Sequence, residues 1–106
     1  MVQNPDDVRR AIHSLLNDVV EQSFQLMLEH PAFEAEASAI VHEASESIRR
    51  LVAEVHGLRP PSPDAPRLLH VAYDQRLRRI SEAAETEAMT YHRTIAGLRA
   101  IGTRVN

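Results

Sequence analysis

The chain has 106 residues, of which 43% are hydrophobic and 25% are charged, and it contains no cysteine. These values are typical of a single soluble domain that can bury a core of its own. No apolar run approaches the roughly 18 residues of a membrane span, and the segment from Met1 to Asp7 lacks the basic start and apolar centre of a signal peptide. The sequence therefore predicts a cytoplasmic protein without membrane contact, and disulfide and thiolate chemistry are excluded.

The formal net charge of −3 conceals an asymmetry between the two halves of the chain. Residues 1–57 carry ten acidic residues and four arginines, whereas residues 58–106 carry five acidic residues and eight arginines. Opposite charges favour docking of the two halves against each other. A sequence pI near 6.0 lacks the basic excess of a phosphate-binding surface, so nucleic acid is not an expected partner.

The first predicted helix covers residues 5–29. Asn4 is a helix-capping residue type, Pro5 suits the first helical position, and the acidic residues after it suit the positive end of the helix dipole. Apolar residues then recur at spacings of three and four, which is the period of an amphipathic helix. Near the end of this helix the apolar side chains point in almost all directions. These residues and Phe33, just beyond the turn, are expected to be core residues, part of a subunit interface or the lining of a small-molecule pocket. The set consists of Phe24, Leu26, Met27, Leu28 and Phe33.

The second predicted helix covers residues 32–56. Pro31 disfavours the helical conformation at His30, which predicts a tight turn between two helices, with a single kinked helix as the alternative. Gly57 is the expected helix stop. Residues 57–66 hold four of the six prolines, so we expect an extended, stiff connection there. Its overlapping PxxP spacings are also those of SH3 ligands.

The third predicted helix covers residues 65–102, and its last turns are expected to continue to about residue 104. Apolar residues repeat in steps of three and four from Leu69 to Val105, and no proline follows Pro66. Gly97 and Gly102 weaken the last turns, so a break near residue 97 is an open alternative. Together the three segments predict an all-α antiparallel bundle in one domain, with a helical hairpin at residues 5–56, a proline-rich loop at 57–66 and a long helix at 65–104.

The unequal helix lengths predict a homodimer. If the helices align at the proline-rich end, about 20 Å of the third helix faces water in a monomer, because helices rise about 1.5 Å per residue. We expect a second copy to cover this stretch across a two-fold axis, with Tyr91, Ile95 and Leu98 in the seam.

The six histidines are the main candidates for metal binding in the sequence. No Glu-x-x-His spacing occurs, which argues against a di-iron carboxylate centre. Three pairs do have the i, i+4 spacing of a chelate: His30/Glu34, His42/Glu46 and His70/Asp74. The predicted loop brings the end of the second helix close to the start of the third. No cofactor is expected, and the alternative is a divalent metal held by His56, His70 and Asp74.

One further spacing is similar to that of a nuclease family. HEPN ribonucleases are helical and often dimeric, and they use an arginine followed four to six residues later by a histidine. The segment from Arg50 to His56 has this spacing over seven positions and no further match, so it predicts no family. The leading hypothesis is therefore a non-enzymatic helical module that self-associates or binds a protein partner. A metal-binding bundle and a HEPN-like ribonuclease remain the alternatives.

Overall fold

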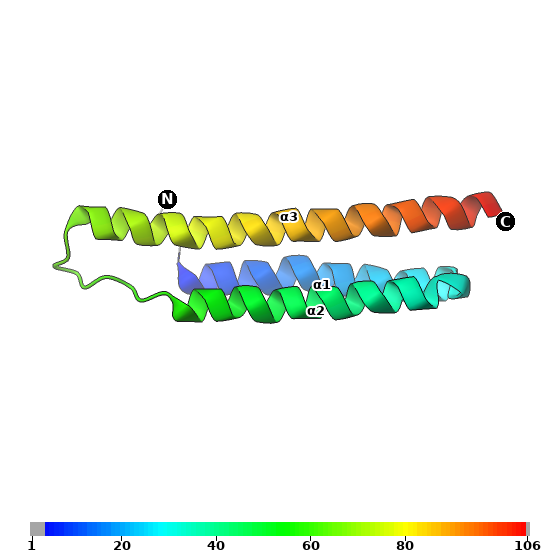
Figure 1. The fold of residues 1–106 in the computed structure, drawn as a ribbon, viewed down its shortest axis with the longest axis horizontal. Helices are drawn as coiled ribbons and strands as arrows, with labels where there is room; N and C mark the ends of the chain where they lie inside the picture. The colour runs from blue at the N-terminus through cyan, green and yellow to red at the C-terminus, as the bar shows by residue number, and fades with distance from the viewer. Residues whose placement is uncertain (1–3, 106) are drawn as a thin grey trace.

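The computed structural model describes residues 4–105 as three helices that lie side by side (Figure 1). Helix α1 covers Pro5–Glu29, α2 covers Glu34–Gly57 and α3 covers Arg67–Val105. The bundle is elongated, with principal extents of 63, 18 and 14 Å. The predicted all-α antiparallel bundle is confirmed: α1 and α2 form a hairpin, and α3 runs back along it.

The start of α1 follows the predicted capping pattern. The Asn4 side chain accepts a hydrogen bond of 2.8 Å from the backbone N–H of Asp6, and Pro5 occupies the first helical turn. Asp6 and Asp7 lie where the free N–H groups of the helix favour negative charge. Both predicted ends of this helix, residues 5 and 29, match the structure.

The turn between α1 and α2 is tight, as expected from Pro31. It is a single turn of 3₁₀ helix at Pro31–Phe33, so α2 begins two residues later than predicted. The backbone N–H of His30 donates to Leu26 O at 2.8 Å, and the His30 carbonyl accepts from Phe33 N at 2.9 Å. These two bonds fix the backbone of the turn and set the hairpin geometry.

The end of α2 lies at Gly57, where a stop was predicted. No glycine among residues 4–105 has a positive φ, so Gly57 does not form a left-handed cap. The chain leaves the helix through Leu58, which is extended at φ −83° and ψ 131°. The prolines that follow keep it extended until a turn at Ser62–Ala65, closed by a 2.9 Å backbone hydrogen bond.

The third helix is continuous through both of its glycines. It begins at Arg67 and reaches Val105, so no break occurs near Gly97. At about 1.5 Å per residue, its 39 residues span about 58 Å, against about 37 Å for the 25 residues of α1. The difference of about 20 Å must project beyond the hairpin.

The core is a narrow apolar seam along the whole hairpin. Its fully buried side chains come from all three helices, and α1 packs closely against both of its neighbours. Helices α2 and α3 touch each other least. The largest fully buried residues, in chain order, are Val8, Ile12, Leu16, Val19, Ser23, Leu26, Leu51, Leu77 and Ile95.

The expected position of the uncovered part of α3 is wrong. Ile95 is only 2% exposed within a single copy of the chain, and Tyr91 and Leu98 are partly buried against the same core. The extended linker carries the chain past the ends of α1 and α2 before α3 begins, so the overhang lies at the start of α3 (Figure 1). The C-terminal half of α3 covers the hairpin instead.

Among residues 4–105, none of the helices combines the length and the apolar character that crossing a lipid bilayer requires.

Candidate interaction site

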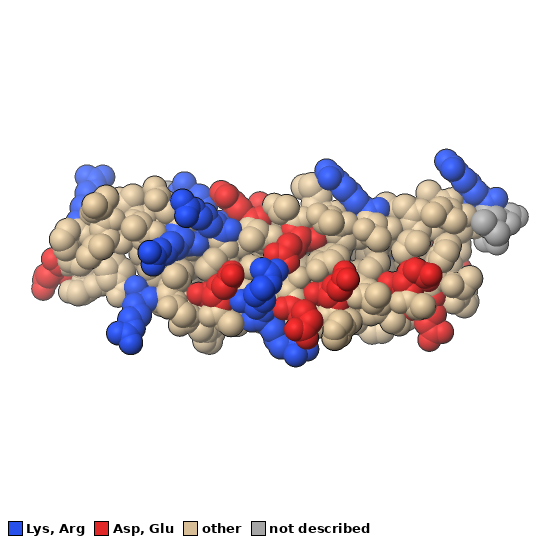
Figure 2. Space-filling model, viewed as in Figure 1, with Lys and Arg blue, Asp and Glu red and all other residues tan. Residues whose placement is uncertain are grey.

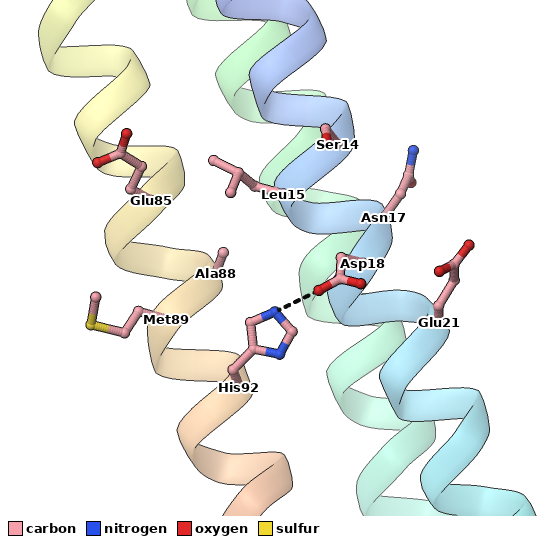
Figure 3. A pocket seen from close by; sticks show the side chains of 9 residues that line it. All are labelled: Ser14, Leu15, Asn17, Asp18, Glu21, Glu85, Ala88, Met89 and His92. Carbon is pink, nitrogen blue, oxygen red and sulfur yellow. Dashed lines mark ion pairs between the residues drawn. The ribbon is translucent and has the colours of Figure 1, made fainter.

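A groove with a volume of about 850 Å³ lies between α1 and α3. In Figure 3, Leu15 points from α1 toward α3, and Ala88 points back toward α1, so an apolar floor lies between the two helices. Met89 lines the outer edge of the groove, on the side of α3 that faces away from α1 in Figure 3, and is 53% exposed. Such a floor is suited to an apolar side chain from a partner.

The rim of the α1–α3 groove is acidic. Asp18 and Glu21 line it from α1, and Glu85 lines it from α3. The basic group on this rim is His92, whose Nε2 lies 3.2 Å from Asp18 Oδ2 (Figure 3). A partner with arginine or lysine beside an apolar side chain would complement both the rim and the floor.

Two polar residues of α3 contact α1 beside the groove. His92 reaches α1 through Asp18, and Arg99 donates to Glu29 Oε2 at 3.1 Å and to Gln22 Oε1 at 3.2 Å. These contacts fix α3 along α1 beside the groove.

The overhang at the start of α3 presents apolar side chains to solvent. Leu68 is 76% exposed, Leu69 is 54% exposed and Val71 is 40% exposed. The linker covers only one side of this segment, where Pro60 and Pro61 lie beside Leu69. Three large apolar residues within four positions are unusual on a free helix surface and are typical of an interaction surface.

Positive charge accompanies the exposed overhang. Figure 2 shows several arginine side chains toward the linker end of the bundle, with further arginines and the acidic side chains distributed along this face. The sequence places five arginines between residues 59 and 79: Arg59, Arg67, Arg76, Arg78 and Arg79. The overhang is therefore apolar and basic, whereas the groove is apolar and acidic.

A polar cluster bridges α2 and α3, the least closely packed pair of helices. Ser47 is 4% exposed, and its Oγ donates to Glu87 Oε1 at 2.7 Å and lies 2.9 Å from the Tyr91 hydroxyl. Arg50 pairs with the same Glu87 oxygen. The cluster was not predicted, although Ser47 occupies a core position between Ala44 and Leu51, where a polar side chain needs a partner.

The Arg50 guanidinium keeps its charge in this cluster. Its hydrogen bond to Glu87 raises the pKa of Arg50 above the ordinary value, with further help from the charges of Glu87 and Glu54. Because this pKa is raised on folding, the pair stabilises the fold below the ordinary range of arginine while Glu87 is charged, and the contribution is lost as the pH rises through the raised pKa. Arg50 is 53% exposed, so solvent screens this contribution. The cluster is therefore a fixed interhelical tie.

The expected cluster at the end of α1 is divided between core and surface. Met27 and Phe33 pack against the core, whereas Phe24 is 52% exposed and Leu28 is 78% exposed. Phe24 and Leu28 are four residues apart on the outer side of α1, so they form a second, smaller apolar surface.

The residues predicted to bind a metal do not form a site in this structure. His56 lies on α2 beside His13 of α1, whereas His70 lies on the overhang of α3. Among residues 4–105, no three His, Asp or Glu side chains are placed to hold one metal ion. The expected proximity of His56, His70 and Asp74 fails because the linker is extended and separates the helix ends.

Arg50 and His56 do not form the pair that a ribonuclease site would need. Six residues along a helix correspond to a rotation of about 240°, which places the two side chains on different faces of α2. Arg50 contacts Glu87 of α3, whereas His56 lines a shallow surface between α1 and α2. The geometry gives this alternative no support.

Comparison of the chain with known protein families, with curated proteins and with solved structures finds no match.

Proposed function

We propose that this chain is a non-enzymatic, self-associating helical module whose partner is a second copy of itself. The observation that carries the proposal is the overhang of α3, a helical segment that keeps three large apolar residues in water. Burying an apolar side chain of the size of leucine stabilises a protein by about 1.5–3 kcal/mol. The hairpin of the same chain does not reach the overhang and cannot bury these side chains.

The choice of a second copy rests on charge. The overhang carries apolar residues beside arginines, and the α1–α3 groove carries an apolar floor beside Asp18, Glu21 and Glu85. One chain thus holds both members of a complementary pair of surfaces. Closed dimers are the commonest way for such surfaces to meet.

Sedimentation equilibrium over the micromolar to millimolar range tests the proposal. We expect the wild-type mass to rise from 11.9 kDa toward that of a dimer as the concentration increases. The Leu68→Ser variant should shift this rise to higher concentration. Leu28→Ser is the matched control. Leu28 and Leu68 are similarly exposed, at 78% and 76%, but they lie at opposite ends of the bundle.

Two outcomes would contradict the proposal. A wild type that keeps the monomer mass throughout the range refutes self-association. Loss of association in Leu28→Ser, but not in Leu68→Ser, would move the interface to the outer side of α1 and refute the role of the overhang.

A further inference from the structure

A regular stripe of exposed residues runs along α3 from the overhang to the groove. Its members are separated by alternating steps of four and three residues, which keeps them on one side of a helix. We call this set the α3 stripe, and it consists of Val71, Gln75, Arg78, Glu82, Glu85 and Met89. All six residues are exposed, although the alternation is that of a coiled-coil seam.

The chemistry of the stripe is arranged around its midpoint. Residue 80 lies halfway between Arg78 and Glu82, and also halfway between Val71 and Met89. An antiparallel copy of α3 with its two-fold axis at residue 80 would place each of these residues opposite the other member of its pair. Opposite charges would then meet near the centre, and apolar side chains would meet toward each end.

We propose that two copies of this chain pair antiparallel through the α3 stripe, with the two-fold axis at residue 80. In this register Arg78 of each copy faces Glu82 of the other, Val71 faces Met89, and Gln75 faces Glu85. The inference rests on the proposed self-association and adds the register and orientation of the dimer.

The same register brings the overhang onto the groove. Met89 belongs to the α3 stripe and also lines the outer edge of the groove, so Val71 of the second copy would lie against this edge. The arginine at position 67 would approach the acidic rim, which matches the charge complementarity of the two surfaces.

The charged centre of the stripe is available for such a contact. Among residues 4–105, neither Arg78 nor Glu82 takes part in an ion pair of the structure. Because the axis repeats the contact, each dimer would contain two Arg78–Glu82 pairs. A charge at the centre of a seam selects one register and one orientation over others.

Charge reversal tests this register. In Arg78→Glu, two carboxylates from each copy meet at the centre, and in Glu82→Arg two guanidinium groups meet, so we expect each variant to dimerise at least about tenfold more weakly than wild type. The double variant Arg78→Glu/Glu82→Arg restores opposite pairs and should regain most of the wild-type affinity. An equimolar mixture of the two single variants should form heterodimers, because both central pairs are then attractive.

Cysteine crosslinking tests the orientation independently. The chain has no cysteine of its own, so a single introduced thiol per copy is unambiguous. A mixture of Val71→Cys and Met89→Cys should form a disulfide-linked heterodimer. Two copies of Met89→Cys should not crosslink, because an antiparallel register separates these positions by about 27 Å along the helix axis.

The outcomes separate this inference from the proposed function. If wild type is monomeric at all concentrations, both fail. If wild type dimerises but the charge-reversal variants dimerise equally well, or if Met89→Cys crosslinks to itself, the module self-associates through another surface and only the register proposed here is refuted.

Discussion

The two glycines in the last part of α3 give opposite predictions for the same substitution. A Cβ added at Gly97 meets no atom within 4 Å, whereas a Cβ at Gly102 would lie 2.7 Å from His30 Nδ1 and 2.8 Å from His30 Cε1. Alanine is favoured over glycine in a helix by about 1 kcal/mol. Gly97→Ala should therefore raise the free energy of unfolding by about 0.5–1 kcal/mol.

At Gly102 the gain in helix propensity is opposed by a steric clash between the added Cβ and the His30 ring. The His30 ring must retreat by several tenths of an ångström, and its backbone is held by the bonds to Leu26 and Phe33. Overpacking of this kind costs about 1–3 kcal/mol, so Gly102→Ala should end below wild type by up to about 2 kcal/mol. For a domain of about 100 residues, 1 kcal/mol corresponds to a change of roughly 4–8 °C in Tm.

Urea and thermal unfolding followed by circular dichroism measure both variants, at concentrations where the protein is monomeric. The double variant His30→Ala/Gly102→Ala separates the clash from other effects, since it removes the ring and should recover the helix-propensity gain relative to His30→Ala alone. A Gly102→Ala protein as stable as Gly97→Ala would refute the reasoning. It would mean that the His30 ring leaves its place over α3 at no cost.

Two further comparisons test the packing of the bundle by the same unfolding measurements. Ser47→Ala should lower the free energy of unfolding by about 1 kcal/mol because Glu87 and Tyr91 lose a partner, whereas Ser23→Ala should change it little because the Ser23 hydroxyl bonds only the Val19 carbonyl of its own helix. Equal losses in both would show that the interhelical bonds of Ser47 add nothing. Ile95→Ala should cost about 2–4 kcal/mol in the monomer, and Met89→Ala, at an exposed position, should cost less than about 0.5 kcal/mol. A small loss for Ile95→Ala would place this residue outside the core.

Most of the local structure followed from the sequence because it depends on neighbouring residues. The start of α1 was predicted to the residue because Asn4 and Pro5 determine it through their own side chains. The turn at Pro31 was predicted for the same reason, since the proline ring restricts the residue before it. The exit from α2 was placed correctly at Gly57, although this glycine has no positive φ and the chain leaves the helix through the extended Leu58.

The polar contacts between helices required knowledge of which helix faces lie together. Ser47 could have been flagged as a polar residue within an apolar stripe, but its partners Glu87 and Tyr91 are 40 and 44 positions away. The metal triad failed through a related error. It assumed that a nine-residue connection folds back, whereas a proline-rich segment stays extended and separates the helices it joins.

The sequence did not determine the position of α3 along the axis of the hairpin. This position decides where the interaction surface lies. Apolar residues continue along nearly the whole of α3, so the periodicity allows the helix to cover the hairpin with either end projecting. The length of the extended linker and the contacts of Arg99 with Glu29 and Gln22 select one arrangement. That arrangement buries Ile95 in the core and leaves Leu68 and Val71 exposed. A dimer of this chain is therefore expected to form through the first half of α3, and the aliphatic residues of the second half belong to the fold of each copy.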